Sequence, residues 1–293
     1  MLKTHGRYAY APITNRPDFT WPNGRRLALY IAIGVEEYSF GEGLSEDLLP
    51  GTPRDDLSAA SWRDYGNRVG GFRLIQMLSA HGICPTILLN TALYDHAAPL
   101  VQAARAAGAE FVAHGIANSD TLVGLNPEEE AAYLRRVADR IAREEGTSPA
   151  GWSSPWLAHT SATIDLLAKQ GFKYILDLRH DDQPTWLITQ SERLLSIPYA
   201  LELNDSTTII GRQASAREFA DMIVDEFDAL LAASEETPLV MSLVLHSFIS
   251  GQPFRLTPLK RALDHILRHR DDIWLTRPGD IAAMIGNTPE MAV

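Results

Sequence analysis

Leu27–Phe40 reads LALYIAIGVEEYSF and contains the clearest structural signal in the chain. The seven residues Leu27–Ile33 are apolar without alternation, which is typical of a strand buried on both faces of a parallel sheet. Glu36 and Glu37 follow it, and buried carboxylates need partners. Catalytic groups collect at the carboxyl ends of parallel strands, so the pair is a candidate site, unless it only marks the return to solvent.

Strand and helix patterns alternate along the rest of the chain with no break in composition. We expect a single-domain α/β fold, a (β/α) barrel of about seven strands or a close relative. Residues 1–26, rich in proline and aromatics, are predicted to form an extended N-terminal arm, and 27–293 the barrel domain. The long loop over 41–61 is expected to cover a site. Further strands are predicted at about 85–90, 110–113, 174–176, 195–199, 239–245 and 273–275.

Composition restricts the classes of partner. The 293 residues are 45% hydrophobic and carry a formal charge of −11, which argues against nucleic acid or an anionic membrane as a partner. Cys84 is the only cysteine, so neither an internal disulfide nor a thiolate metal cluster is expected. The start has no apolar signal region and no window resembles a membrane span, so a cytoplasmic protein is expected.

Polar residues recur where the predicted strands end, and at one mouth of a barrel they would converge. They are Glu36, Glu37, Asn90, His114, Asp177, Tyr199 and His246. Each of them also has a plain structural interpretation, such as a histidine bonded to a carbonyl.

Three short motifs lie near these positions. Asn118 follows His114 at helical spacing. Trp152 and Trp156 flank a turn and would wall a small planar ligand. Asp181 and Asp182 form a second acidic pair, which is more often a turn than a site, and the sequence leaves its role open.

Eight segments together resemble the polysaccharide deacetylase family. They are WPNGRRLAL, VEE, RDYGNRVGGFR, AHGIANSD, GWSSP, DDQP, SIPYALELND and LHSFISGQP, and they extend over nearly the whole chain. The resemblance implies a deformed (β/α) barrel of the carbohydrate esterase 4 type. It is greatest to the intracellular branch that contains cofactor-independent bacterial allantoinases and cyclic-imide hydrolases.

The resemblance also implies roles. Glu36 stands at the place of the catalytic base and Glu37 at that of a metal ligand. The family's metal-binding His-x-x-x-His falls on His114 and Asn118, and its late histidine, a general acid, falls on His246. The arginine of the family's third motif is missing, since Ser153–Pro155 occupies that region.

These departures disfavour a metal. A catalytic zinc normally keeps three protein ligands, mostly histidine and carboxylate. Glu37 and His114 supply two, and Asn118 offers only a neutral amide oxygen. We therefore expect no cofactor, with zinc held by Glu37, His114 and Asn118 as the alternative.

The expected chemistry is hydrolysis of an amide. Glu36 would activate water, its pKa raised by Glu37 beside it, and His246 would be the acid. His114 would orient the water or polarise the carbonyl. The predicted substrate-binding residues are Asn90, Asn118, Trp152, Trp156 and Asp177.

We therefore predict a hydrolase of non-peptide carbon–nitrogen bonds in a small, cyclic amide, imide or ureide. One alternative is a metal-dependent deacetylase of an N-acetylated sugar or amine. A second is a catalytically inactive barrel that binds or scaffolds. Homo-oligomers are expected from the family resemblance and from the N-terminal arm.

Overall fold

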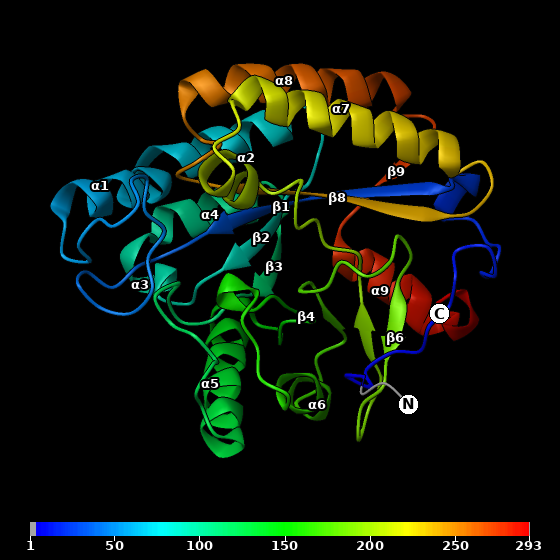
Figure 1. Cartoon of the computed structure of the whole chain (residues 1–293), viewed down its shortest axis with the longest axis horizontal. Helices are drawn as coiled ribbons and strands as arrows, with labels where there is room; N and C mark the ends of the chain where they lie inside the picture. The colour runs from blue at the N-terminus through cyan, green and yellow to red at the C-terminus, as the bar shows by residue number, and fades with distance from the viewer. Residues whose placement is uncertain (1–3, 293) are drawn as a thin grey trace.

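The computed structural model describes residues 4–292, which form an α/β fold around one curled sheet (Figure 1). In the described residues the strands run in the order β6-β7-β5-β4-β3-β2-β1-β8, and β9 also pairs with β1. Every pairing is parallel except β6 with β7. The strands are β1 (Leu27–Val35), β2 (Thr86–Leu89), β3 (Glu110–Ala113), β4 (Gly151–Trp152), β5 (Tyr174–Ile175), β6 (Thr185–Leu187), β7 (Leu194–Ser196), β8 (Leu239–His246) and β9 (Ile273–Leu275).

Helices follow most of the strands, and α7 and α8 lie side by side along β8 (Figure 1). α5 begins with a capping box, in which the Asn126 side chain and Glu129 satisfy each other's backbone N–H groups, and ends at Gly146 with φ 75°. The helices are α1 (Leu57–Tyr65), α2 (Gly71–Ala80), α3 (Leu93–His96), α4 (Ala98–Ala106), α5 (Pro127–Glu145), α6 (Thr163–Lys169), α7 (Ala216–Ala233), α8 (Pro253–Ile266) and α9 (Pro278–Asn287).

β1 and β8 are the two longest strands and neighbours in the sheet, with β8 at the end of the strand order. Every residue of both strands is buried, as their uninterrupted apolar sequences predict. They pair residue by residue from Leu27 with Leu239 to Gly34 with His246. The predicted α/β fold and deformed barrel are confirmed. About seven strands were expected and β4 and β6 were not among them, because Gly-Trp and Thr-Trp-Leu form no apolar run.

The described part of the N-terminal segment lies against the barrel. Arg7 forms an ion pair with Asp165 at 2.8 Å, and Arg16 pairs with Asp181. The indole of Trp21 is buried and donates to the Leu239 carbonyl. Asp181 thus has a structural partner, which accounts for one residue of the DDQP motif.

In the residues that the structure describes, no helix has the length and apolar character that crossing a membrane requires.

Candidate active site

Gly34 allows the ends of β1 and β8 to bring their functional side chains together. A Cβ atom at this position would lie 2.8 Å from Cδ2 of His246 and 3.1 Å from Oε1 of Glu36. Carbon atoms do not approach so closely without displacing something. The absence of a side chain at Gly34 is therefore a condition for the contact between Glu36 and His246.

The Glu36 carboxylate lies between two imidazoles and a phenol. Its Oε1 atom is 3.4 Å from Nε2 of His246 and 3.6 Å from Nε2 of His114. Its Oε2 atom accepts a hydrogen bond of 2.6 Å from the Tyr38 hydroxyl. The side chains of Glu36, His114 and His246 expose 3%, 5% and 11% of their area. Residues predicted from three strand ends therefore meet in one largely buried cluster.

The ring of His246 is held from behind by Asp205, which is fully buried. Oδ1 of Asp205 lies 2.6 Å from Nδ1 of His246, and Oδ2 accepts the backbone N–H groups of His246 and Ser250 at 2.9 and 3.2 Å. The carboxylate can only accept, so Nδ1 carries a proton and Nε2 faces Glu36. Sequence reasoning missed Asp205, although it lies within the SIPYALELND segment.

His114 is oriented in the same way by a backbone carbonyl. Its Nδ1 atom lies 2.8 Å from the Ser153 oxygen, which only accepts, so Nδ1 carries a proton. Nε2 is then the atom directed at Glu36. The Ser-Ser segment at 153–154 therefore supports His114 through its main chain.

The charges of the cluster reinforce one another. Burial alone would raise the pKa of Glu36, but the His246 and His114 imidazoles outweigh it and hold that pKa well below its usual value. Burial alone would lower the pKa of His246, but Glu36 and Asp205 raise it well above its usual value. At neutral pH the arrangement favours a carboxylate facing an imidazolium. The prediction that the pKa of Glu36 is raised was wrong.

That error has a geometric cause. Consecutive side chains leave a strand toward opposite faces, so Glu37 points away from the Glu36 carboxylate. Its oxygens lie 3.2 Å from Nδ2 of Asn67 and 3.6 Å from Nδ1 of His96. Burial raises the pKa of Glu37, with the Asp64 charge adding to it while His96 and Asn67 oppose it.

The predicted zinc ligands do not converge. The Glu37 carboxylate is directed at Asn67 and His96, while Nε2 of His114 faces Glu36. Among the described residues, no group of three histidine, cysteine, aspartate or glutamate side chains has a geometry suited to a metal ion. The donors that the sequence assigned to zinc do not fit it.

The side-chain amide of Asn90 is fully occupied by hydrogen bonds to the backbone. It is completely buried, its Oδ1 accepts the backbone N–H of Glu37 at 2.9 Å, and its Nδ2 donates to the His114 carbonyl. Both ends of the amide are used to tie the strand ends together. The prediction of Asn90 as a substrate ligand is corrected on this ground.

Asn118 and Asp177 each keep one buried oxygen without a hydrogen-bond partner among the described residues: Oδ1 of Asn118 and Oδ2 of Asp177. Nδ2 of Asn118 donates to the Tyr38 hydroxyl at 2.8 Å, and Oδ1 of Asp177 accepts from the Ser154 N–H at 2.8 Å. Unsatisfied buried acceptors are costly, so these two atoms suit a polar ligand.

Trp152 and Trp156, both predicted to line the ligand site, lie in different environments in the structure. Trp152 is fully buried in the hydrophobic core, packs edge-to-face on Phe172 and donates to Ser154, so it does not wall a ligand. Trp156 is 38% exposed and donates its indole N–H to the Asn118 carbonyl at 2.6 Å. Its φ of 60° is unusual for a bulky residue. Trp156 alone retains the position expected of a wall.

The loop over 41–56 joins the two sides of the cluster. The backbone N–H of Leu44 donates to the Ser119 carbonyl at 2.9 Å, and the Ser206 hydroxyl donates to Oε2 of Glu46 at 2.7 Å. Arg63 binds the Glu46 carbonyl and lies 5.0 Å over the Tyr38 ring. Burial raises the pKa of Glu46, which His246 opposes. Tyr38 and Glu46 were not predicted from the sequence.

Along most of its length, the chain is similar to several known proteins. No family model matches the chain. The "putative polysaccharide deacetylase" of Schizosaccharomyces pombe is 24% identical over 304 residues, which cover 92% of each chain. The crystal structure of a "probable polysaccharide deacetylase" from Pseudomonas aeruginosa PAO1 has 26% identity and a TM-score of 0.83, covering 93% of this chain and 95% of its own. The PuuE allantoinase structure has 27% identity and a TM-score of 0.83, covering 94% and 95%.

Proposed function

Because this chain belongs to the polysaccharide deacetylase family, we propose that it hydrolyses a carbon–nitrogen bond in a small cyclic amide, imide or ureide. The observation that carries the proposal is the Glu36 carboxylate held 3.4 and 3.6 Å from two imidazole nitrogens. The similarity to the PuuE allantoinase supports a cyclic ureide as the class of substrate.

The cluster supplies a base and an acid for one reaction. Glu36 accepts a proton from the attacking water as the oxygen bonds to the carbonyl carbon. His246 then donates its Nε2 proton to the leaving nitrogen as the carbon–nitrogen bond breaks. The proton on Glu36 passes back to His246 across the 3.4 Å between them, which restores the starting charges.

Asp205 and Tyr38 hold this pair in place. The Asp205 carboxylate stabilises the imidazolium form of His246, and the hydrogen bond from Tyr38 fixes the second oxygen of Glu36. His114 directs its Nε2 at the same carboxylate, where it would orient the water or the carbonyl oxygen.

Oδ1 of Asn118 accepts no hydrogen bond among the described residues and suits an N–H group of an imide or ureide, which is a hydrogen-bond donor. Oδ2 of Asp177 likewise accepts none, although Nδ1 of His159 lies 4.0 Å from it. Trp156 would cover a flat ring beside Asn118. These three residues are our proposed substrate contacts.

A panel of substrates tests the proposal. Allantoin, hydantoin, succinimide and N-acetylglucosamine are incubated with the protein, with and without a chelator, and product is followed by chromatography. We expect turnover of a cyclic compound that the chelator does not affect. Deacetylation of N-acetylglucosamine that the chelator abolishes and zinc restores would instead establish the metal-dependent deacetylase. No turnover of any compound would favour the inactive barrel.

We also propose a homo-oligomer, in which the N-terminal segment contributes to the interface. Size-exclusion chromatography with light scattering checks this, and a monomer at micromolar concentration would contradict it.

A further inference from the structure

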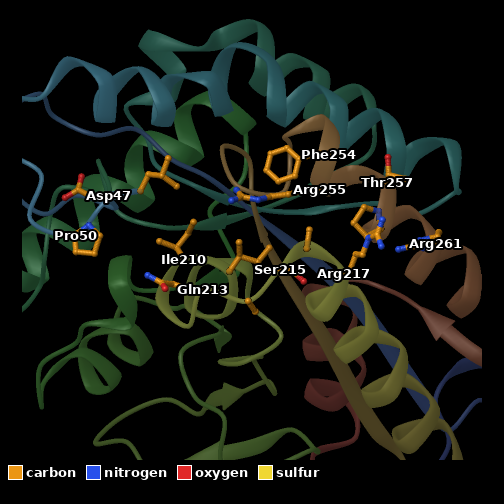
Figure 2. Close-up of a pocket in the computed structure, with 15 residues that line it drawn as sticks. Asp47, Pro50, Ile210, Gln213, Ser215, Arg217, Phe254, Arg255, Thr257 and Arg261 are labelled. Carbon is orange, nitrogen blue, oxygen red and sulfur yellow. The ribbon is translucent and has the colours of Figure 1, made fainter.

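A cavity of about 590 Å³ lies beyond the loop that joins the two sides of the candidate active site (Figure 2). It is bounded by the loop over 41–56, by the segment Ser206–Gly211 and by the first turns of α7 and α8. Glu36, His114 and His246 do not line it. Any ligand it takes is therefore additional to the substrate of the cluster.

Three arginines line this cavity. Figure 2 shows Arg217 of α7 and Arg261 of α8 at the same end, near Thr257, with Arg255 nearer the middle. Nearby arginines outside the cavity have acidic partners, as Arg212 does with Glu202 at 2.5 Å. Within the described residues, none of the three cavity arginines forms an ion pair with a carboxylate. In a chain with a formal charge of −11, three unpaired guanidinium groups in one cavity attract an anion.

Arg255 adds a partly buried charge to this arrangement. It is partly buried, and its Nη1 donates to the Ile249 carbonyl at 3.2 Å. Burial lowers its pKa, and only the distant Asp205 charge opposes this. No carboxylate in the described residues forms an ion pair with Arg255, so an anion bound in the cavity would supply a counter-charge for its guanidinium.

The remaining lining is mixed: Leu48, Pro50, Ile210 and Phe254 are apolar, whereas Asp47 and Gln213 are polar. The Asp47 carboxylate is paired with Arg63 at 3.0 Å. Leu48 and Phe254 line the cavity although 49% and 66% of their area is exposed, and Ile210 of the segment Ser206–Gly211 lines it as well. The Ser215 and Thr257 side chains add hydroxyl groups to the charged end. A ligand that fits has a charged head with several acceptor oxygens and an apolar body.

We propose that this cavity binds a phosphomonoester with an apolar or aromatic body. Guanidinium groups bind phosphate through paired N–H donors. The phosphate lies between Arg217 and Arg261, and the body lies on Phe254 and Ile210. The volume of about 590 Å³ falls in the range of small-molecule sites.

Calorimetric titration with phenyl phosphate tests the proposal at neutral pH and low salt. We expect saturable binding at one site per chain, weaker binding of inorganic phosphate and none of phenol. Binding of phenol as strong as that of phenyl phosphate would overturn the role of the arginines. Absence of saturable binding of phenyl phosphate would overturn the site itself.

Substitutions locate the binding. Arg217→Gln and Arg261→Gln should each weaken phenyl phosphate binding on the order of tenfold, since each removes charge-assisted hydrogen bonds. Lys260→Gln is the matched control, because Lys260 precedes Arg261 on α8 but pairs with Asp264 and does not line the cavity. Unchanged affinity in both arginine variants, with their melting temperatures preserved, would overturn the proposal. Because binding is measured directly, the result is independent of whether the active-site cluster hydrolyses any compound.

Discussion

Oε1 of Glu36 lies 3.4 Å from Nε2 of His246, at the point where β1 and β8 end side by side. The two residues come from opposite ends of the chain, and the register from Leu27 with Leu239 to Gly34 with His246 brings them together. Asp205 bonds to Nδ1 of His246, and the Tyr38 hydroxyl donates to Oε2 of Glu36, so the four side chains form one buried hydrogen-bonded group. The predictions below test its parts.

Gly34→Ala should strongly lower activity although it changes no charged residue. The new Cβ would lie 2.8 Å from the His246 ring, so the ring and Glu36 must separate. A displacement of about 1 Å costs on the order of a hundredfold in rate. Steady-state kinetics measure the loss. Gly286→Ala in α9 is the control, since a Cβ there meets nothing within 4 Å and should leave the rate unchanged.

Asp205→Asn should lower activity and move the alkaline limb of the pH–rate profile to lower pH. The Asp205 charge is one cause of the raised pKa of His246, and the amide removes it while keeping the volume. We expect a loss of about tenfold or more at pH 8 and a smaller one at pH 6. A uniform loss at all pH values would indicate that Asp205 only supports the fold.

Tyr38→Phe should reduce kcat by about tenfold, because it removes one hydrogen bond to a charged carboxylate. It also leaves Nδ2 of Asn118 without its partner. Tyr65→Phe is a matched control, since the Tyr65 hydroxyl accepts from Arg73 instead. Equal effects of the two substitutions on kcat would contradict the role given to Tyr38.

The pH–rate profile of the unaltered protein should have an unusually broad plateau. Glu36 has a lowered pKa, so its charged form persists below the usual carboxyl pKa of about 4.3 and is lost only as the pH falls well beneath that value. His246 has a raised pKa, so its acid form persists above about 6.5 and is lost as the pH rises further. An alkaline limb at about pH 6.5 would show that Glu36 and Asp205 do not act on His246.

The sequence predicted the parts of this molecule that long patterns encode. β1 and β8 are continuous apolar runs, and the polar residues that follow them, Glu36 and His246, lie where parallel strand ends predict. β4 and β6 were missed because their sequences, Gly-Trp and Thr-Trp-Leu, form no apolar run, whereas β5 and β9 are as short but lie in the apolar runs Tyr174–Leu176 and Ile273–Leu275.

Other features depend on contacts that no local pattern encodes. Asp205 immediately precedes the helical turn Ser206–Gly211 and is not at the end of a predicted strand, so no strand pattern marks its bond to His246. Asn90 and Trp152 have the residue types of a binding site, but their partners are the backbone and the core. The pKa of Glu36 was misjudged because its neighbour in sequence, Glu37, is not its neighbour in space.

The central claim is that Glu36 and His246 act as one unit in hydrolysis. The direct measurement is kcat/KM of Glu36→Gln, His246→Gln and the double variant on the cyclic compound that the panel identifies, with circular dichroism confirming the fold. Groups that act together show strongly non-additive losses. We predict that each single variant loses on the order of a thousandfold and that the double variant loses about as much as the worse single one. A folded Glu36→Gln protein that keeps its activity within tenfold would contradict the account.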